Sequence, residues 1–299
     1  MTDKLIVLVL GGGPDRERDV SLVSAAQVAG ALRAAGHRTI ERDILPDDTS
    51  ALDETFDVVF PVLHGAFGEG GPLQQLLEQR GVPFVGCGSK AASAAMDKVA
   101  TKQIARQLGV PTPDWQILTR SDALTLQLPV VIKPLNEGSS VGVFICHAEQ
   151  DVTQARAELH GRHPRVMAER FIGGREMTVG IFDDRALPVI EIIPSVMFYD
   201  YQAKYSRDDT RYGFDVLPGI AEPMQRDAVT LFRGLGCRHL SRVDFIVDAQ
   251  NRPWMLEINT MPGFTTHSLL PMAARKSGIE MPALCDKLVK LALQTPVGR

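Results

Sequence analysis

A short apolar segment that ends in a run of glycines constrains the fold more than any other feature of the chain. Residues 4–10 are mostly apolar and are followed at once by Gly11, Gly12 and Gly13. A run this short, ending in glycine, is typical of a buried strand and not of a secretory signal peptide. Apolar residues then recur at helical spacing, at Leu22, Ala25, Ala29 and Leu32. The two patterns together predict a strand followed by a helix.

Further signals extend this unit into a parallel sheet. Strands are expected at residues 38–44, 57–63 and 82–85, with a helix at residues 72–80 between the last two. Alternation of strands and helices favours parallel pairing. We therefore predict an N-terminal, Rossmann-like α/β domain over residues 1–88.

The pattern then changes to hairpin-rich α+β. A second domain, residues 89–176, is expected to open with a helix from about Asp97 to Gly109. Its strands are expected at residues 130–133, 142–146 and 166–171.

A third domain, residues 177–299, is expected to contain long strands and two closing helices. The strands are predicted at residues 187–193, 243–247 and 254–258, and the helices near residues 268–277 and 282–293. Residues 198–218 follow neither the strand nor the helix period, and their length is typical of a loop that covers a site. The alternative for this loop is a surface excursion.

Net charge and cysteine content limit the kinds of molecule that the protein is expected to bind and the compartment in which it is expected to act. The formal net charge of −4 argues against nucleic-acid binding, because phosphate backbones select clustered Lys and Arg. No apolar stretch is long enough to cross a bilayer. Neither disulfides nor a structural metal is expected from the scattered Cys87, Cys146, Cys237 and Cys285. We predict a cytoplasmic protein that acts on small molecules.

The glycines after the first strand resemble the start of a dinucleotide-binding fingerprint, in which glycines let backbone N–H groups approach phosphate. Arg16 stands where the third glycine of that fingerprint would be, although Asp43 is placed like a ribose-binding acid. A tight turn that needs glycine dihedrals is the alternative. The Gly-Lys-Ser/Thr of a Walker-type loop is also missing from the sequence. A nucleotide enzyme with this sequence must hold phosphate in another way.

Two lysines and a small loop offer that other way. Lys98, Lys133 and the run Glu137-Gly138-Ser139-Ser140-Val141-Gly142 can supply ammonium, hydroxyl and backbone N–H groups to phosphates. Each lysine alone could be a solvated surface charge. Lys133, however, follows an apolar strand and precedes Pro134, so we expect it to project from a strand end into a cleft.

Acidic and amide side chains gather near the C-terminus. Asp244 lies on one expected strand, and Glu257 and Asn259 lie two residues apart, hence on one face, of the next. Oxygen ligands of this kind suit magnesium. The alternative is a structural ion pair between Asp244 and Arg242.

These residues resemble the ATP-grasp fold, and several segments resemble the D-alanine:D-alanine ligase family more specifically. The ATP-grasp matches are Lys98, Lys133-Pro134, residues 137–142, Ala168-Glu169-Arg170-Phe171, Asp244 and Glu257-Ile258-Asn259. The family-specific matches are residues 17–22, Leu63-His64-Gly65, residues 198–201 and 203–205, residues 259–263 and His267-Ser268-Leu269. They run from the first strand to the penultimate helix.

The resemblance implies a three-domain ATP-grasp architecture and an ATP-dependent ligase that joins two D-alanines through an acyl phosphate, for peptidoglycan precursor synthesis. It places ATP against Lys98, Lys133, Glu137, Ser139, Ser140, Val141, Glu169, Arg170, Phe171, Ile172, Glu176 and Lys204. It assigns two magnesium ions, replaceable by manganese, to Asp244, Glu257 and Asn259.

For the substrates, the resemblance implies that Glu17 meets the first D-alanine's ammonium group and that Arg242 and the Gly263 N–H stabilise the oxyanion. It also places His64, Lys204, Arg242, Ser268 and Leu269 at the D-alanines, and links Tyr205 through Ser139 to Glu17. The family is usually dimeric, so a homodimer is expected. The group that deprotonates the incoming amine is not identified by the sequence.

The sequence departs from the family in three places. It has Glu69-Gly70-Gly71 where the family has Glu-Asp-Gly, Glu17-Arg18-Asp19 where the family has Glu-Arg-Glu, and a longer stretch at residues 212–218. A related ligase with D-serine, D-lactate or an L-amino acid as second substrate therefore stays open as an alternative. A nicotinamide-dependent Rossmann protein is the alternative from another class.

Overall fold

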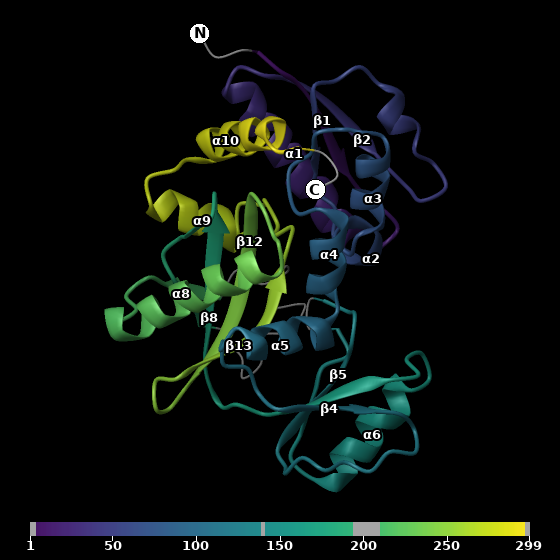
Figure 1. Ribbon diagram of the computed structural model, residues 1–299, viewed down its shortest axis with the longest axis vertical. Helices are drawn as coiled ribbons and strands as arrows, with labels where there is room; N and C mark the ends of the chain where they lie inside the picture. The colour runs from purple at the N-terminus through teal and green to yellow at the C-terminus, as the bar shows by residue number, and fades with distance from the viewer. Residues whose placement is uncertain (1–3, 139–140, 194–209, 297–299) are drawn as a thin grey trace.

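Three β-sheets follow one another along the long axis of the molecule (Figure 1). The computed structural model describes residues 4–138, 141–193 and 210–296. No helix among the described residues is long and apolar enough to span a membrane.

The N-terminal sheet is parallel, as predicted. Its strand order is β2-β1-β3, from β1 (Ile6–Gly11), β2 (Arg38–Asp43) and β3 (Val58–Pro61), with α1 (Arg18–Ala34) connecting the first two. The predicted helix at residues 72–80 is α3 (Pro72–Gln79). The strand predicted at residues 82–85 is wrong in extent, since the segment forms one parallel bridge between Val59 and Phe84. Pro61 and Pro83 lack the N–H groups that would extend this ladder.

The middle sheet is antiparallel and forms the body of the molecule. Its order is β11-β10-β8-β12-β13, with β9 paired to β8. The strands are β8 (Gly174–Phe182), β9 (Arg185–Ala186), β10 (Ile190–Ile193), β11 (Arg211–Gly213), β12 (Leu240–Asp248) and β13 (Pro253–Asn259). The prediction missed β8 and also α8 (Pro218–Gly234).

Strand β8 is covered on both faces, which explains why it was missed. Val179 and Ile181 belong to the same core cluster as residues of α8. A side chain at Gly180 would meet Leu270 and Ala273 of α9 (Leu269–Lys276) on the other face. A strand buried on both faces lacks the alternation of apolar and polar residues on which strand prediction depends.

The third sheet has the order β4-β7-β5-β6 and lies in the lower lobe of Figure 1. It contains β4 (Trp115–Leu118), β5 (Val130–Pro134), β6 (Phe144–Cys146) and β7 (Val166–Arg170), with α6 (Glu149–Leu159) packed on it. The three strands predicted here are confirmed.

Four short helices, α2 (Gly65–Gly68), α3, α4 (Ser89–Met96) and α5 (Lys98–Gln107), connect the first sheet to the third. The Asp97 carboxylate accepts hydrogen bonds from the N–H groups of Val99 and Ala100, which confirms it as the N-cap of α5. Gly109 ends this helix region with φ +74°.

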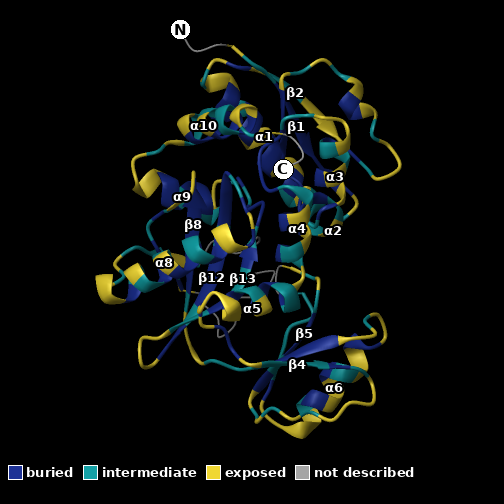
Figure 2. Cartoon of the chain, in the orientation of Figure 1, coloured by how far each residue is buried: buried dark blue, intermediate teal, exposed yellow. Residues whose placement is uncertain are grey.

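The C-terminus returns to the beginning of the chain. Helix α10 (Met281–Gln294) packs beside α1, and their apolar residues share one buried cluster with β1 and β3 (Figures 1 and 2). The His37 ring bonds the Asp286 carboxylate at 2.9 Å across this contact. The N-terminal sheet is therefore stabilised by the last helix of the chain.

Candidate functional site

The predicted acidic residues lie on two hydrogen-bonded strands. In the register of β12 and β13, Asp244 is opposite Glu257 and Arg242 is opposite Asn259, with an irregularity just after Asp244. The strand register thus places the three predicted ligands and Arg242 at paired positions of two neighbouring strands. Two carboxylates opposite each other repel, so the site requires nearby cations.

Arg242 supplies one of these cations. Its Nε and one terminal nitrogen each donate to an Asp244 carboxylate oxygen at 2.9 Å, and the Thr178 hydroxyl donates to the same carboxylate at 2.6 Å. The ion pair that we considered as an alternative to a metal site is thus present. Lys98 supplies a second cation, because its Nζ lies 3.5 Å from Glu257 Oε2.

The three predicted ligands, Asp244, Glu257 and Asn259, carry the oxygen donors that magnesium prefers. Among the described residues there is no group of three His, Cys, Asp or Glu side chains that could hold a metal by themselves. Magnesium usually needs fewer, since one or two carboxylates are completed by phosphate oxygens and water. Asn259 Oδ1 accepts the Met261 N–H at 2.9 Å, and an amide oxygen has a second lone pair for a cation.

A pocket lies between the middle sheet and the third sheet. Its walls come from β5, β6, β7, β8, β12, β13 and the loop after β5. Eight of the residues predicted to contact ATP line it, namely Lys98, Lys133, Glu137, Glu169, Arg170, Phe171, Ile172 and Glu176. Asp244 and Glu257 line it too, so the predicted nucleotide and metal groups face one space.

Buried charges converge on Glu169 in this pocket. The Lys133 ammonium donates to Glu169 Oε2 at 2.6 Å, and the Lys102 ammonium lies 2.5 Å from Oε1. Burial acts to raise the pKa of Glu169, but the ammonium groups of Lys133 and Lys102 outweigh burial and hold that pKa below its ordinary value. The sequence analysis missed Lys102, although it lies four residues after Lys98 and so on the same face of α5.

Lys98 connects this pocket to the loop after β5, which is predicted to bind phosphate. Its Nζ donates to the Glu137 carbonyl oxygen at 2.5 Å, and the Glu137 carboxylate pairs with the His163 ring at 3.0 Å. Burial lowers the pKa of Lys98, and the Glu257 carboxylate opposes that change. Lys98 is therefore a buried ammonium group and not the solvated surface charge of the alternative interpretation.

A second pocket adjoins the first on the side of the N-terminal sheet. Glu17, Glu69, Arg242, Asn259 and Thr260 line it, and Lys98, Glu137 and Glu257 line both pockets. This pocket brings together Glu17, predicted for the first D-alanine, and Arg242, predicted for the oxyanion, but His64 and Gly263 do not line it. The shared residues Lys98, Glu137 and Glu257 lie at the junction of the two pockets.

Glu69 also lines this pocket, although the sequence analysis noted it only within a departure from the family and gave it no role. Burial, with the nearby Glu17 carboxylate, raises the pKa of Glu69 to about 8. Its Oε1 accepts the Gly65 N–H at 3.1 Å and lies 3.9 Å from His64 Nδ1. Burial lowers the pKa of His64, so the ring is neutral near pH 7.

The departure from the family beside Glu69 has a steric reason. A Cβ atom on Gly70 would lie 2.4 Å from the Ala66 carbonyl oxygen, so this backbone has no room for the family's aspartate. The glycine fits the close turn between α2 and α3.

The remaining predicted residues lie apart from these pockets or outside the described residues. Among the described residues, Val141, His64, Gly263, Ser268 and Leu269 do not line either pocket. Ser268 Oγ accepts the Thr265 N–H at 2.9 Å, in the turn that leads into α9. Ser139, Ser140, Lys204 and Tyr205 lie outside the described residues, as do residues 198–209 of the predicted covering loop. Of residues 210–218, Arg211–Gly213 form strand β11 and so are not aperiodic.

The geometry counts against a nicotinamide site at the N-terminal glycines. The Asp43 carboxylate pairs with Arg18 and accepts N–H groups from Gly13 and Ile44, so it is engaged within the protein. These contacts fix the turn after β1, which is the structural alternative for the glycine run.

Comparison with known proteins gives one family. Two family models match the chain, "D-ala D-ala ligase N-terminus" over residues 35–87 and "D-ala D-ala ligase C-terminus" over residues 104–290. The chain is 45% identical to a D-alanine–D-alanine ligase of Laribacter hongkongensis, with 96% of each chain covered. It is 44% identical to the enzyme of that name from Bordetella avium, covering 93% of this chain and 91% of the relative.

Solved structures agree with the sequence comparison. The D-alanine–D-alanine ligase of Bacillus anthracis complexed with ATP matches with a TM-score of 0.85 at 30% identity, over 98% of both chains. The VanG D-Ala:D-Ser ligase of Enterococcus faecalis matches with a TM-score of 0.85 at 26% identity, over 97% of this chain and 100% of the other. These neighbours have the ATP-grasp fold that the sequence predicts.

Proposed function

Because the chain belongs to the D-alanine–D-alanine ligase family, we propose that one of its two adjoining pockets binds ATP and the other binds the first D-alanine of the same reaction. The protein is an ATP-dependent ligase that joins two D-alanines through an acyl phosphate, releasing ADP and phosphate, in the synthesis of peptidoglycan precursors. The observation that supports this assignment is the set of residues that line both pockets, namely Lys98, Glu137, Gly138, Leu256 and Glu257.

The pocket between the middle and third sheets receives ATP. Lys98 and Lys133 neutralise its phosphates, and the walls from Arg170 to Ile172 and from Val143 to Ile145 cover its base and sugar. Asp244, Glu257 and Asn259 would hold magnesium, which when bound supplies positive charge against the phosphate oxygens. Phosphoryl transfer needs positioning and charge neutralisation more than a protein nucleophile, and this pocket provides both.

The pocket beside the N-terminal sheet receives the first D-alanine. Glu17 accepts a hydrogen bond from the substrate's ammonium group. The substrate's carboxylate is then directed toward Lys98 and Glu257 at the junction of the two pockets. Arg242, held by its two bonds to Asp244, directs its positive charge toward the oxyanion that forms when the amine attacks.

The second D-alanine has contacts that are proposed from family resemblance. Ser268, Leu269 and the Gly263 N–H are assigned to its carboxylate and to the oxyanion. Tyr205, acting through Ser139 toward Glu17, and Lys204 complete the assignment. Their test is kinetic, because a residue at the second site changes the second Michaelis constant and leaves the first unchanged.

Quaternary state, compartment and domain limits are proposals as well. We propose a homodimer, and a cytoplasmic location that agrees with four free, buried cysteines. We propose domain limits at residues 88 and 176, near the changes from the first sheet to the third and from the third to the middle one.

A ligase that uses D-serine as second substrate is the competing function, since the similar VanG protein is a D-Ala:D-Ser ligase. The deciding assay measures phosphate release from ATP and magnesium with D-alanine alone, and with D-alanine plus D-serine, D-lactate or L-alanine. Release that saturates with D-alanine alone, together with a dipeptide product, supports the proposal. Release that requires one of the other compounds would replace it.

A further inference from the structure

We propose that Lys102 is a positioning residue of the nucleotide pocket, whose buried ammonium group holds the Glu169 carboxylate so that Lys133 remains available to the phosphates of ATP. This inference rests on the proposed ATP site. It concerns a residue that does not line either pocket among the described residues and so acts through another side chain.

The surroundings of Lys102 are built to hold a charge. Its side chain is 0% exposed, and its Nζ lies 2.5 Å from Glu169 Oε1 and donates to the Thr112 hydroxyl at 2.5 Å. The ring of Trp115 covers the same ammonium, with its centroid 5.3 Å away. Burial lowers the pKa of Lys102 to about 8 and the Glu169 carboxylate opposes that change, so the ammonium group is charged at neutral pH.

This arrangement changes the net charge around Glu169. Glu169 is also almost fully buried and reaches Lys133 through its other oxygen at 2.6 Å. With Lys133 alone, the pair would be neutral, and a phosphate would have to compete with Glu169 for the ammonium. With Lys102 added, two ammonium groups share one carboxylate, and the cluster keeps a net positive charge toward the pocket.

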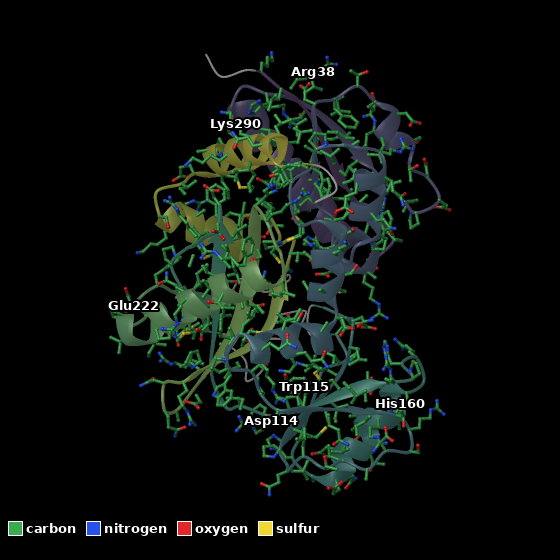
Figure 3. All side chains as sticks on the ribbon, viewed as in Figure 1. Arg38, Asp114, Trp115, His160, Glu222 and Lys290 are labelled. Carbon is green, nitrogen blue, oxygen red and sulfur yellow. The ribbon has the colours of Figure 1, made fainter. Side chains whose placement is uncertain are left out.

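A hydrogen-bonded chain fixes this cluster to the strand that carries Glu257. The Thr112 hydroxyl, which accepts from Lys102, donates to the Met255 carbonyl oxygen at 2.8 Å, and the Met255 N–H donates to Pro111. Met255 is two residues before Glu257 on β13, but the pairing shifts between them, so that Met255 lies in the core and Glu257 lines the pocket. Lys102 thus sits where α5, the third sheet and the metal-site strand meet; Trp115, labelled in Figure 3, marks the place.

The first test measures binding of ATP with magnesium by calorimetry, without D-alanine. Lys102→Met keeps the length of the side chain and removes its charge. We expect it to weaken ATP binding about tenfold, and Thr112→Val to weaken it less, in the same direction. Lys90→Met, at an exposed position on α4, is the matched control and should bind ATP like the wild type.

The second test separates positioning from stability through a double-mutant cycle. If Lys102 acts through the charge of Glu169, Lys102→Met should weaken ATP binding less than about threefold in a Glu169→Gln background. The Michaelis constants for D-alanine should stay within about twofold of the background values. Equal losses in both backgrounds, or Lys102→Met with normal ATP affinity and only a lower melting temperature, would overturn the inference.

The role of Lys102 can still be tested if Lys102→Met does not fold or if the proposed reaction is wrong. If Lys102→Met does not fold, Thr112→Val and its double mutant with Glu169→Gln decide the matter alone. If the wild type binds ATP but releases no phosphate with D-alanine, the proposed reaction fails, while the binding cycle still decides the role of Lys102. A wild type that does not bind ATP would overturn both.

Discussion

Glu69→Gln should change how the stability of the free protein depends on pH. The Glu69 carboxyl is buried near Glu17, and its pKa is about 8 in the folded chain against an ordinary 4.5. Between pH 4.5 and 8 the folded state therefore holds a proton that the unfolded state has released. Stability is fully present below pH 4.5 and is lost as pH rises, because the folded state binds more protons in this interval.

The magnitude follows from the width of the interval. Each pH unit between the two pKa values costs about 1.4 kcal/mol of folding free energy, so the loss reaches roughly 4–5 kcal/mol near pH 8. Glutamine is neutral at every pH and keeps an oxygen for the Gly65 N–H, which Glu69 Oε1 accepts at 3.1 Å. Glu69→Gln should thus unfold with nearly the wild-type free energy at pH 5 and be several kcal/mol more stable at pH 8.

Urea unfolding of the apo protein at pH 5, 6, 7 and 8 measures this difference. His64 lies beside Glu69, and its lowered pKa makes stability rise with pH toward 6.5, so the comparison uses the difference between the wild type and Glu69→Gln at each pH. Glu222→Gln, at an exposed position on α8 that Figure 3 labels, is the control. Parallel wild-type and Glu69→Gln profiles across this range would refute the reasoning.

Three further perturbations test the site and its support. Glu257→Gln should abolish ligation while the urea midpoint stays near that of the wild type, because it removes a proposed metal ligand; near-normal turnover at saturating magnesium would contradict the metal assignment. Glu17→Gln should weaken first-site binding of D-alanine by roughly ten- to a hundredfold, because it removes a charge-assisted contact of about 1.5–3 kcal/mol. A lower melting temperature with an unchanged first-site constant would instead mean that Glu17 only stabilises the N-terminus of the helix through its dipole. Asp97→Ala should destabilise the fold by about 1 kcal/mol through the lost cap of α5, and a midpoint equal to that of the wild type would contradict the cap.

Local patterns in the sequence were sufficient for much of the fold. The glycine-terminated strand and the following helical spacing predicted β1 and α1, and Asp97 marked the start of α5. The same patterns failed at β8, which is buried on both faces, and at α8, which begins at Pro218, within the segment predicted as a loop, and has Pro223 in its interior. The strand period loses meaning where packing covers both faces, as at β8, whereas α8 does carry a buried face at helical spacing (Ile220, Met224, Leu231) that the prediction overlooked.

The sequence likewise predicted one part of the candidate site and missed another. The sequence determined that Asp244, Glu257 and Asn259 would meet, because residues on two consecutive strands of a hairpin are neighbours whenever the hairpin forms. Only the tertiary structure decided the states of Glu69 and Lys102. The first is a carboxyl that burial near Glu17 keeps protonated to about pH 8, and the second is an ammonium enclosed by groups from other elements. Protonation and charge pairing depend on burial and on neighbours distant in sequence, and these exist only once the chain has folded.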